Sequence, residues 1–263
     1  MRYEEMYGIL EKEFQNSFVE ELVPGIVHNF ANPLNGIMGR SKLLQRKLVD
    51  FIKRADLEKD ASWEENNRKL VRDVDSISRE ADRLSVLLQT VMGKFCAVGD
   101  RTVQKVNLSE LLENEMRFFD FYLDFKHTVK KTVQFDKELP DVKGTPADYS
   151  LALSTLIRYA AAAMKECPSR ELIIATQYDG EQVCVKMESR GEGVSAYLKK
   201  LLPSDVKGDL LSLETMGEVE DVLLCAFSLL RKWEATIDIK TGDALSTVNI
   251  LVPVYKGTHQ SGD

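Results

Sequence analysis

Two stretches in the first hundred residues repeat apolar side chains at alternating steps of three and four, and no other feature constrains the fold as strongly. The later stretch keeps this alternation in the series Leu70, Val74, Ile77, Ala81, Leu84, Leu88 and Val91. The earlier stretch keeps it, with one polar interruption, in the series Val23, Val27, Phe30, Leu34, Ile37, Ser41, Leu44, Leu48 and Phe51. Such spacing places apolar residues along one face of a helix. The pattern therefore predicts two long helices joined by the polar segment 54–67.

A single pair of antiparallel helices cannot bury two apolar seams by itself. The simplest way to cover both is to pair two copies of the hairpin into a four-helix bundle. We therefore expect residues 1–100 to form a dimerising helical hairpin, and the chain to be a homodimer. Residues 1–20 predict a short amphipathic helix before the first seam.

After residue 100 the pattern changes to short alternating strands mixed with apolar helices. A helix is expected after Asn107, whose side chain suits the N-cap position, and two further helices over 149–164 and 219–233. The expected strands are 132–135, 172–178, 182–188, 235–240 and 246–254. Consecutive strands between helices predict an α+β sandwich over residues 101–256, with helices on one face of the sheet. Residues 257–263 are polar, and we expect a flexible tail.

Composition excludes several classes of protein. The formal net charge of −7 argues against nucleic acid as the main partner, because phosphate binding needs a basic surface. The longest apolar stretch, near 222–230, is too short to cross a bilayer, so no membrane span is expected. No metal site is expected from the four scattered cysteines, which we interpret as reduced thiols of a cytoplasmic protein: Cys96, Cys167, Cys184 and Cys225.

The candidate reactive residue is His28, on the first of the two long helices. Its helical stripe continues through the polar residues Asn35 and Lys42, so the ring should lie beside the apolar seam and face solvent. An imidazole is a nucleophile near neutral pH, because its ordinary pKa is about 6.5. Asn32 follows one turn later on the same face. These residues alone leave open the alternative of a surface histidine without a chemical role.

The segment around His28 resembles the histidine box of bacterial two-component sensor histidine kinases. That motif is a histidine, usually an acidic residue, two further residues, Asn or Thr, and then Pro-Leu. Here it reads Gly25-Ile-Val-His28-Asn-Phe-Ala-Asn32-Pro33-Leu-Asn-Gly-Ile-Met-Gly39. The resemblance implies a histidine phosphotransfer hairpin in residues 1–100, followed by a GHKL-type (Bergerat-like) ATPase-like domain in 101–256. It also implies that His28 accepts a phosphoryl group on a ring nitrogen and exchanges it with the aspartate of a response-regulator receiver domain.

Two asparagines near His28 bear on which of the family's activities this chain is expected to have. The family usually has Glu or Asp after the histidine, where it helps to take the imidazole proton during attack on ATP. Asn29 stands there instead; its amide can orient the ring by accepting from Nδ1–H, but it cannot act as a base. Asn32 matches the family position associated with phosphatase activity, where an amide orients water against the receiver's phospho-aspartate.

Three features by which the family binds nucleotide are altered in this chain. Tyr159 stands where the buried helix should carry an Asn for the magnesium triphosphate. Ser189 replaces the Asp that precedes Gly-x-Gly, although Gly191 and Gly193 remain. The glycine-rich lid corresponds to Gly217-Glu-Val-Glu-Asp-Val222, whose three carboxylates would repel a triphosphate by roughly 1 kcal/mol per contact in water. We therefore expect these positions to be degenerate and to bind no cofactor.

The leading interpretation is a cytoplasmic, dimeric histidine phosphotransferase or phosphatase of histidine-kinase type that does not use ATP efficiently. The receiver would supply Mg²⁺, and an upstream kinase or sensor would be a further partner. The first alternative is an ATP-dependent sensor histidine kinase with a divergent nucleotide pocket. The second is a non-enzymatic pseudokinase that binds a receiver without moving phosphate.

Overall fold

The computed structural model describes residues 2–54, 62–165, 167, 169–190, 218–241 and 245–255. The chain forms two compact units, one of Leu22–Met92 and one that combines Met1–Glu21 with Gly93–Asp263. This division differs from the expected boundary at residue 100, because the N-terminal segment groups with the second half of the chain. The expected tail 257–263 lies outside the described residues.

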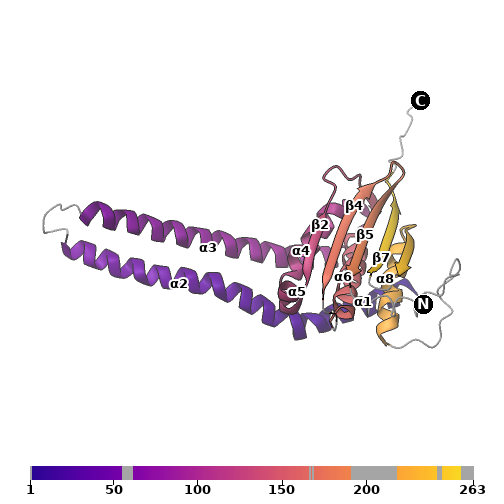
Figure 1. The fold of residues 1–263 in the computed structure, drawn as a ribbon, viewed down its shortest axis with the longest axis horizontal. Helices are drawn as coiled ribbons and strands as arrows, with labels where there is room; N and C mark the ends of the chain where they lie inside the picture. The colour runs from indigo at the N-terminus through magenta and orange to yellow at the C-terminus, as the bar shows by residue number, and fades with distance from the viewer. Residues whose placement is uncertain are drawn as a thin grey trace, which may run out of the picture. The chain divides into compact units, whose positions relative to one another are not determined.

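The first unit is a helical hairpin built from α2 (Val23–Arg54) and the greater part of α3 (Ser62–Gly99), which run side by side (Figure 1). Two contacts between the helices involve polar or small residues. Lys47 Nζ lies 2.5 Å from Asp73 Oδ2, and a Cβ on Gly36 would lie 3.3 Å from Cγ of Glu80. These two pairs show that the helices are antiparallel, as the periodicity predicts.

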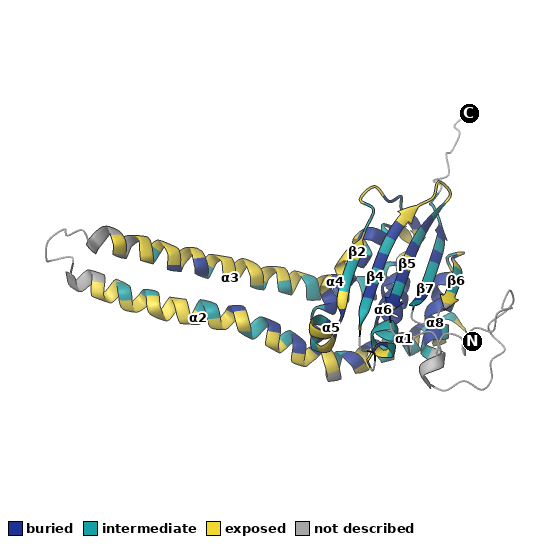
Figure 2. Cartoon of the chain, in the orientation of Figure 1, coloured by how far each residue is buried: buried dark blue, intermediate teal, exposed yellow. Residues whose placement is uncertain are grey.

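The hairpin covers only half of each predicted apolar seam, and Figure 2 shows long exposed stretches on both helices. One heptad position of each seam is half-buried in the residues Phe30, Ile37, Leu44, Leu70, Ile77, Leu84 and Val91, whereas Val23, at the same position at the start of α2, is 38% exposed. The other heptad position is exposed, in the residues Val27, Leu34, Ser41, Leu48, Val74, Ala81 and Leu88. A single hairpin therefore leaves a stripe made mainly of valine and leucine uncovered.

The second unit is an α+β sandwich, which confirms the predicted fold class. Among the described residues after 100, its helices are α4 (Leu108–Phe119), α5 (Leu123–Thr128), α6 (Pro146–Ala163) and α8 (Glu218–Arg231). Its strands are β1 (Gln104–Val106), β2 (Lys130–Gln134), β3 (Val142–Gly144), β4 (Glu171–Tyr178), β5 (Gln182–Arg190), β6 (Thr236–Thr241) and β7 (Leu245–Pro253).

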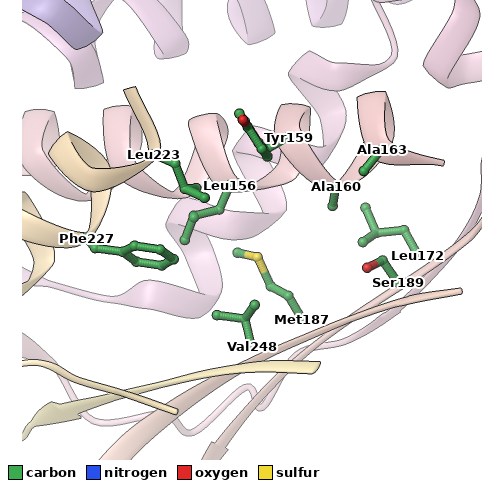
Figure 3. Close-up of a pocket in the computed structure, with 10 residues that line it drawn as sticks. All are labelled: Leu156, Tyr159, Ala160, Ala163, Leu172, Met187, Ser189, Leu223, Phe227 and Val248. Atoms are coloured by element: carbon green, nitrogen blue, oxygen red, sulfur yellow. The ribbon is translucent and has the colours of Figure 1, made fainter. Parts of the chain in front are cut away.

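Five strands form a mixed sheet in the order β2-β4-β5-β7-β6, with β2 and β4 parallel and the other neighbours antiparallel. The expected hairpin turn is present between β4 and β5, where Asp179 precedes Gly180 and Gly180 adopts a φ of 101°. Helices α6 and α8 pack on one face of this sheet (Figures 1 and 3). The small antiparallel pair of β1 and β3, and helix α5, were not anticipated from the sequence.

Capping side chains account for where two of the helices begin. The side chain of Asn107 accepts from the backbone N–H of Glu110, as predicted for the start of α4. Thr145 accepts in the same way from the N–H of Asp148 at the start of α6, and Pro146 follows at the first helical position. Both caps satisfy donors that would otherwise be unpaired at a helix N-terminus.

Helix α1 (Tyr3–Ser17) belongs to the sandwich, where it packs against α6 and α8. Its buried face carries Tyr7, Leu10, Phe14 and Ser17. The hydroxyl of Tyr3 donates to the buried carboxylate of Asp148 at 2.6 Å. A π-helical turn, Phe18–Leu22, then leads into α2. None of the helices in the described part of the chain is long and apolar enough to span a lipid bilayer.

Candidate functional site

His28 lies on α2 with its side chain exposed, as the register of the helix predicts. Asn32, one turn later, is also exposed, so the two polar groups share one accessible surface. Asn29 is different: only 7% of its surface is exposed. Consecutive helical residues project about 100° apart, which explains how an exposed imidazole and a buried amide can be neighbours.

The helix around His28 carries no charged side chain. Residues 24–32 read Pro-Gly-Ile-Val-His-Asn-Phe-Ala-Asn, so no acidic or basic group lies within one turn of the imidazole along α2. A base for proton removal is therefore absent from this stretch. The ring is exposed to solvent on α2.

The structure brings two of the altered nucleotide-site positions together. Tyr159 on α6 and Ser189 on β5 line a single cavity between the helices and the sheet (Figure 3). Its other walls are Leu156, Ala160, Ala163, Leu172, Met187, Leu223, Phe227 and Val248. Gly191 and Gly193 lie outside the described residues, as do the side chains of 218–221. Val222 is half-buried in α8, one residue before Leu223.

The cavity lined by the ten described residues is small and uncharged. Its volume is about 30 Å³, which is room for about two water molecules. Ligand pockets commonly enclose roughly 300–1,000 Å³. None of its ten lining side chains carries a charge or a carboxamide, so these ten residues offer no ligand for a magnesium ion.

Sequence reasoning missed a buried ionic cluster. Lys94, near the end of α3, donates to both carboxylate oxygens of Glu115 on α4 and to Oγ of Ser150 on α6, each at 2.8 Å. Burial lowers the pKa of Lys94, although the charge of Glu115 opposes this shift. Lys94 sits in an otherwise ordinary helical stretch, so no local signal marks it as buried.

A second cavity, of about 230 Å³, lies beside this cluster, between β1, α4 and the last turns of α3. Lys94 and Glu115 line it, but they face each other. Two further polar residues of its wall are engaged as well: Gln104 donates to Asp100, and Asn107 donates to the carbonyl of Leu139. These four polar residues of the wall therefore already have partners.

Comparison with solved structures finds chains that are similar to this one in fold. The histidine kinase AdeS of Acinetobacter baumannii has a TM-score of 0.43 and 15% identity over 82% of this chain and 96% of that chain. The catalytic domain of the histidine kinase ThkA has a TM-score of 0.46 and 17% identity over 58% and 97%. A bacterial phosphotransferase has a TM-score of 0.41 and 12% identity over 87% and 93%. No protein-family model matches the sequence, and no curated protein matches it.

Proposed function

We propose that the chain is a two-component phosphorelay protein of histidine-kinase type, in which His28 exchanges a phosphoryl group with the aspartate of a response-regulator receiver domain. The observation that carries the proposal is the exposed imidazole of His28 on α2, within the His-x-x-x-Asn-Pro-Leu segment of a helical hairpin. The small, uncharged cavity at Tyr159 and Ser189 supports phosphate arriving from the receiver and not from ATP.

The proposed reaction is an in-line displacement at phosphorus. The lone pair of a ring nitrogen of His28 forms the N–P bond while the P–O bond to the receiver's aspartate breaks, and the aspartate leaves as a carboxylate. Return of the phosphoryl group to an aspartate reverses these steps. A Mg²⁺ ion held by the receiver stabilises the charge on the transferring group, so this chain has to supply only an oriented imidazole.

The two asparagines would assist in different ways. Asn29 directly follows His28, and we assign its amide the task of orienting the ring by accepting from a ring N–H. Asn32 is exposed beside His28, where its amide would orient a water against the phospho-aspartate of a docked receiver. The first role supports transfer to His28, and the second supports hydrolysis of the receiver's phosphate.

The working form would be a homodimer. Each helix of the hairpin exposes one complete heptad position of its apolar seam while the other is half-buried. A second copy placed against these exposed stripes would complete a four-helix bundle and remove valine and leucine side chains from water. His28 lies outside these heptad positions, so it would stay accessible to a receiver in the dimer.

Transfer of label tests the proposal. The full chain would be mixed with a receiver domain that carries a radioactive phosphoryl group on its aspartate. We expect label to appear on the chain as acid-labile phosphohistidine, and to disappear in His28→Ala. The variant His127→Ala, which removes another exposed histidine, is the matched control and should keep the label. Receiver binding without any transfer of label would instead favour a non-enzymatic binding protein.

A further inference from the structure

Helix α2 carries charge of one sign over most of its length. Its residues 23–49 contain no acidic residue and four basic residues, which are Arg40, Lys42, Arg46 and Lys47. Helix α3 is different, because its segment 65–83 contains five acidic and five basic residues. Opposite charges one turn apart on a helix can pair, as Lys69 does with Glu65. No such pair can form within residues 23–49 of α2, in a chain whose formal net charge is −7.

Two of these cations lie on the same side of α2 as His28. Lys42 follows His28 by fourteen residues and Arg46 follows it by eighteen. At 100° per residue, this spacing places both within about 40° of the imidazole around the helix axis. The residues between them on this side are polar or small, and they are Asn32, Asn35 and Gly39. All six residues are exposed and together make up one surface of α2, the His28 face.

The two cations of the His28 face have no counter-ion in the hairpin. Among the residues that the structure describes, neither Lys42 nor Arg46 forms an ion pair. Lys47 differs from them, because its ammonium group is paired with the carboxylate of Asp73 on α3. Lys42 and Arg46 follow each other by about 6 Å along the helix axis, so their unpaired charges reinforce each other. Their combined positive potential favours an acidic partner surface.

The His28 face also stays accessible in the proposed four-helix bundle. That bundle covers the heptad position that contains Ser41 and Leu48. Lys42 follows Ser41 directly and projects about 100° away from that position, and Arg46 projects about 200° away from Leu48. From His28 the face extends about 21 Å to Lys42 and about 27 Å to Arg46, and a small domain is about 30 Å across. One domain docked at His28 therefore reaches both cations.

We propose that Lys42 and Arg46 form a docking surface for an acidic face of the receiver domain that exchanges phosphate with His28. This inference rests on the proposed function and adds the charge of the partner, because receivers with an acidic docking face are selected over receivers with a basic one. Attraction between opposite charges speeds the encounter and fixes the orientation of the docked domain. Nucleic acid fits this face less well, since two cations neutralise few phosphates and the whole chain is acidic.

Binding can be measured separately from phosphate transfer. The full chain would be titrated with a panel of unphosphorylated receiver domains, some with an acidic surface and some with a basic one. We expect acidic receivers to bind about 10-fold or more tightly than basic receivers at low ionic strength. Their Kd should rise several-fold when salt is raised from about 50 mM to about 500 mM, because salt screens exposed charges.

Charge reversal on the two helices provides the matched comparison. The double variant Lys42→Glu with Arg46→Glu should weaken binding of acidic receivers by about 10-fold or more and remove most of its salt dependence. Arg79→Glu reverses an exposed cation among the mixed charges of α3 and should leave the Kd unchanged. All three positions are exposed, so the variants should fold, and circular dichroism would confirm their helix content.

Several outcomes would overturn the docking surface. These are failure of every acidic receiver to bind, unchanged binding in the double variant, or an equal loss in Arg79→Glu. Sedimentation of the chain with phosphatidylserine vesicles, lost in the double variant, would assign the cations to a lipid surface instead. The two proposals also fail in different ways. Charge-dependent binding without label on His28 would refute phosphate exchange alone, whereas transfer of label at an unchanged rate in the double variant would refute the docking surface alone.

Discussion

The ammonium group of Lys94 lies 2.8 Å from both carboxylate oxygens of Glu115, and the two side chains are only 2% and 3% exposed. Phe14 of α1 and Phe118 of α4 flank the ammonium group, with ring centroids at 5.3 and 5.7 Å. Ser150 donates to the same carboxylate at 2.5 Å. One ion pair thus links the end of α3 to α4 and α6, and α1 closes over it.

Removing one member of this pair should destabilise the protein strongly. Lys94→Met leaves the carboxylate of Glu115 buried without its cation, and we expect a loss of about 3–5 kcal/mol in urea unfolding. The double variant Lys94→Met with Glu115→Leu should recover much of this loss, because an apolar pair needs no compensation. Lys69→Met, which breaks the exposed pair of Lys69 with Glu65, should have little effect. Equal losses in the single and double variants would show that the charges are not the cause.

Gly144 packs so closely against Tyr149 that any side chain at residue 144 should destabilise the protein. A Cβ on Gly144 would overlap the ring of Tyr149, a fully buried residue whose hydroxyl donates to the carbonyl of Lys143. Gly144→Ala should therefore cost about 1–3 kcal/mol of stability. Gly8→Ala is the control, because nothing lies within 4 Å of its added methyl group in α1. It should stabilise the chain by up to about 1 kcal/mol through helix propensity.

The exposed heptad position predicts the oligomeric state. Leu88 is 52% exposed and lies on the apolar stripe of α3, so Leu88→Glu should convert a dimer into a monomer in sedimentation velocity. Val86 is similarly exposed, at 56%, but lies outside both heptad positions. Val86→Glu should therefore stay dimeric. A wild-type chain that sediments as a monomer at every concentration would contradict the bundle.

Alkaline pH should weaken the sandwich through Tyr122. Burial raises the pKa of this phenol to about 12, against about 10 in the unfolded chain. The unfolded chain therefore loses this proton first, so the contribution to stability is complete below pH 10 and is lost as the pH rises towards 12. Tyr122→Phe should reduce the alkaline loss by up to about 2 kcal/mol in unfolding measured across this range. Tyr178→Phe, at an exposed position, is the comparison variant.

Local signals predicted the elements of the fold well. The heptad spacing predicted both long helices. Asn107 predicted the start of α4, and Asp179 with Gly180 predicted the turn between β4 and β5. These features depend on residues close together in the sequence. The packing of α1 could not be foreseen in this way, because its anchoring bond joins Tyr3 to Asp148 across 145 residues. The burial of Lys94 could not be predicted for the same reason, since its partners lie on α4 and α6.

The candidate site was predicted in part. The exposed positions of His28 and Asn32 follow from helical register, which the sequence specifies directly. The joint placement of Tyr159 and Ser189 at one cavity needed the fold, because it depends on how α6 lies over β5. The buried hydroxyl of Ser246 has no hydrogen-bond partner in the described part of the chain. This could not be predicted without the fold either, since a serine in an alternating strand gives no sign of whether a hydrogen-bond partner is present.

The most direct test of the central claim compares two phosphate sources in one assay. The full chain would be incubated with radioactive Mg²⁺–ATP in one arm and with a phosphorylated receiver domain in the other, each with wild type and His28→Ala. The account predicts label on wild type from the receiver alone, and none on His28→Ala. Label from ATP, or no label at His28 from any phosphorylated receiver, would contradict it.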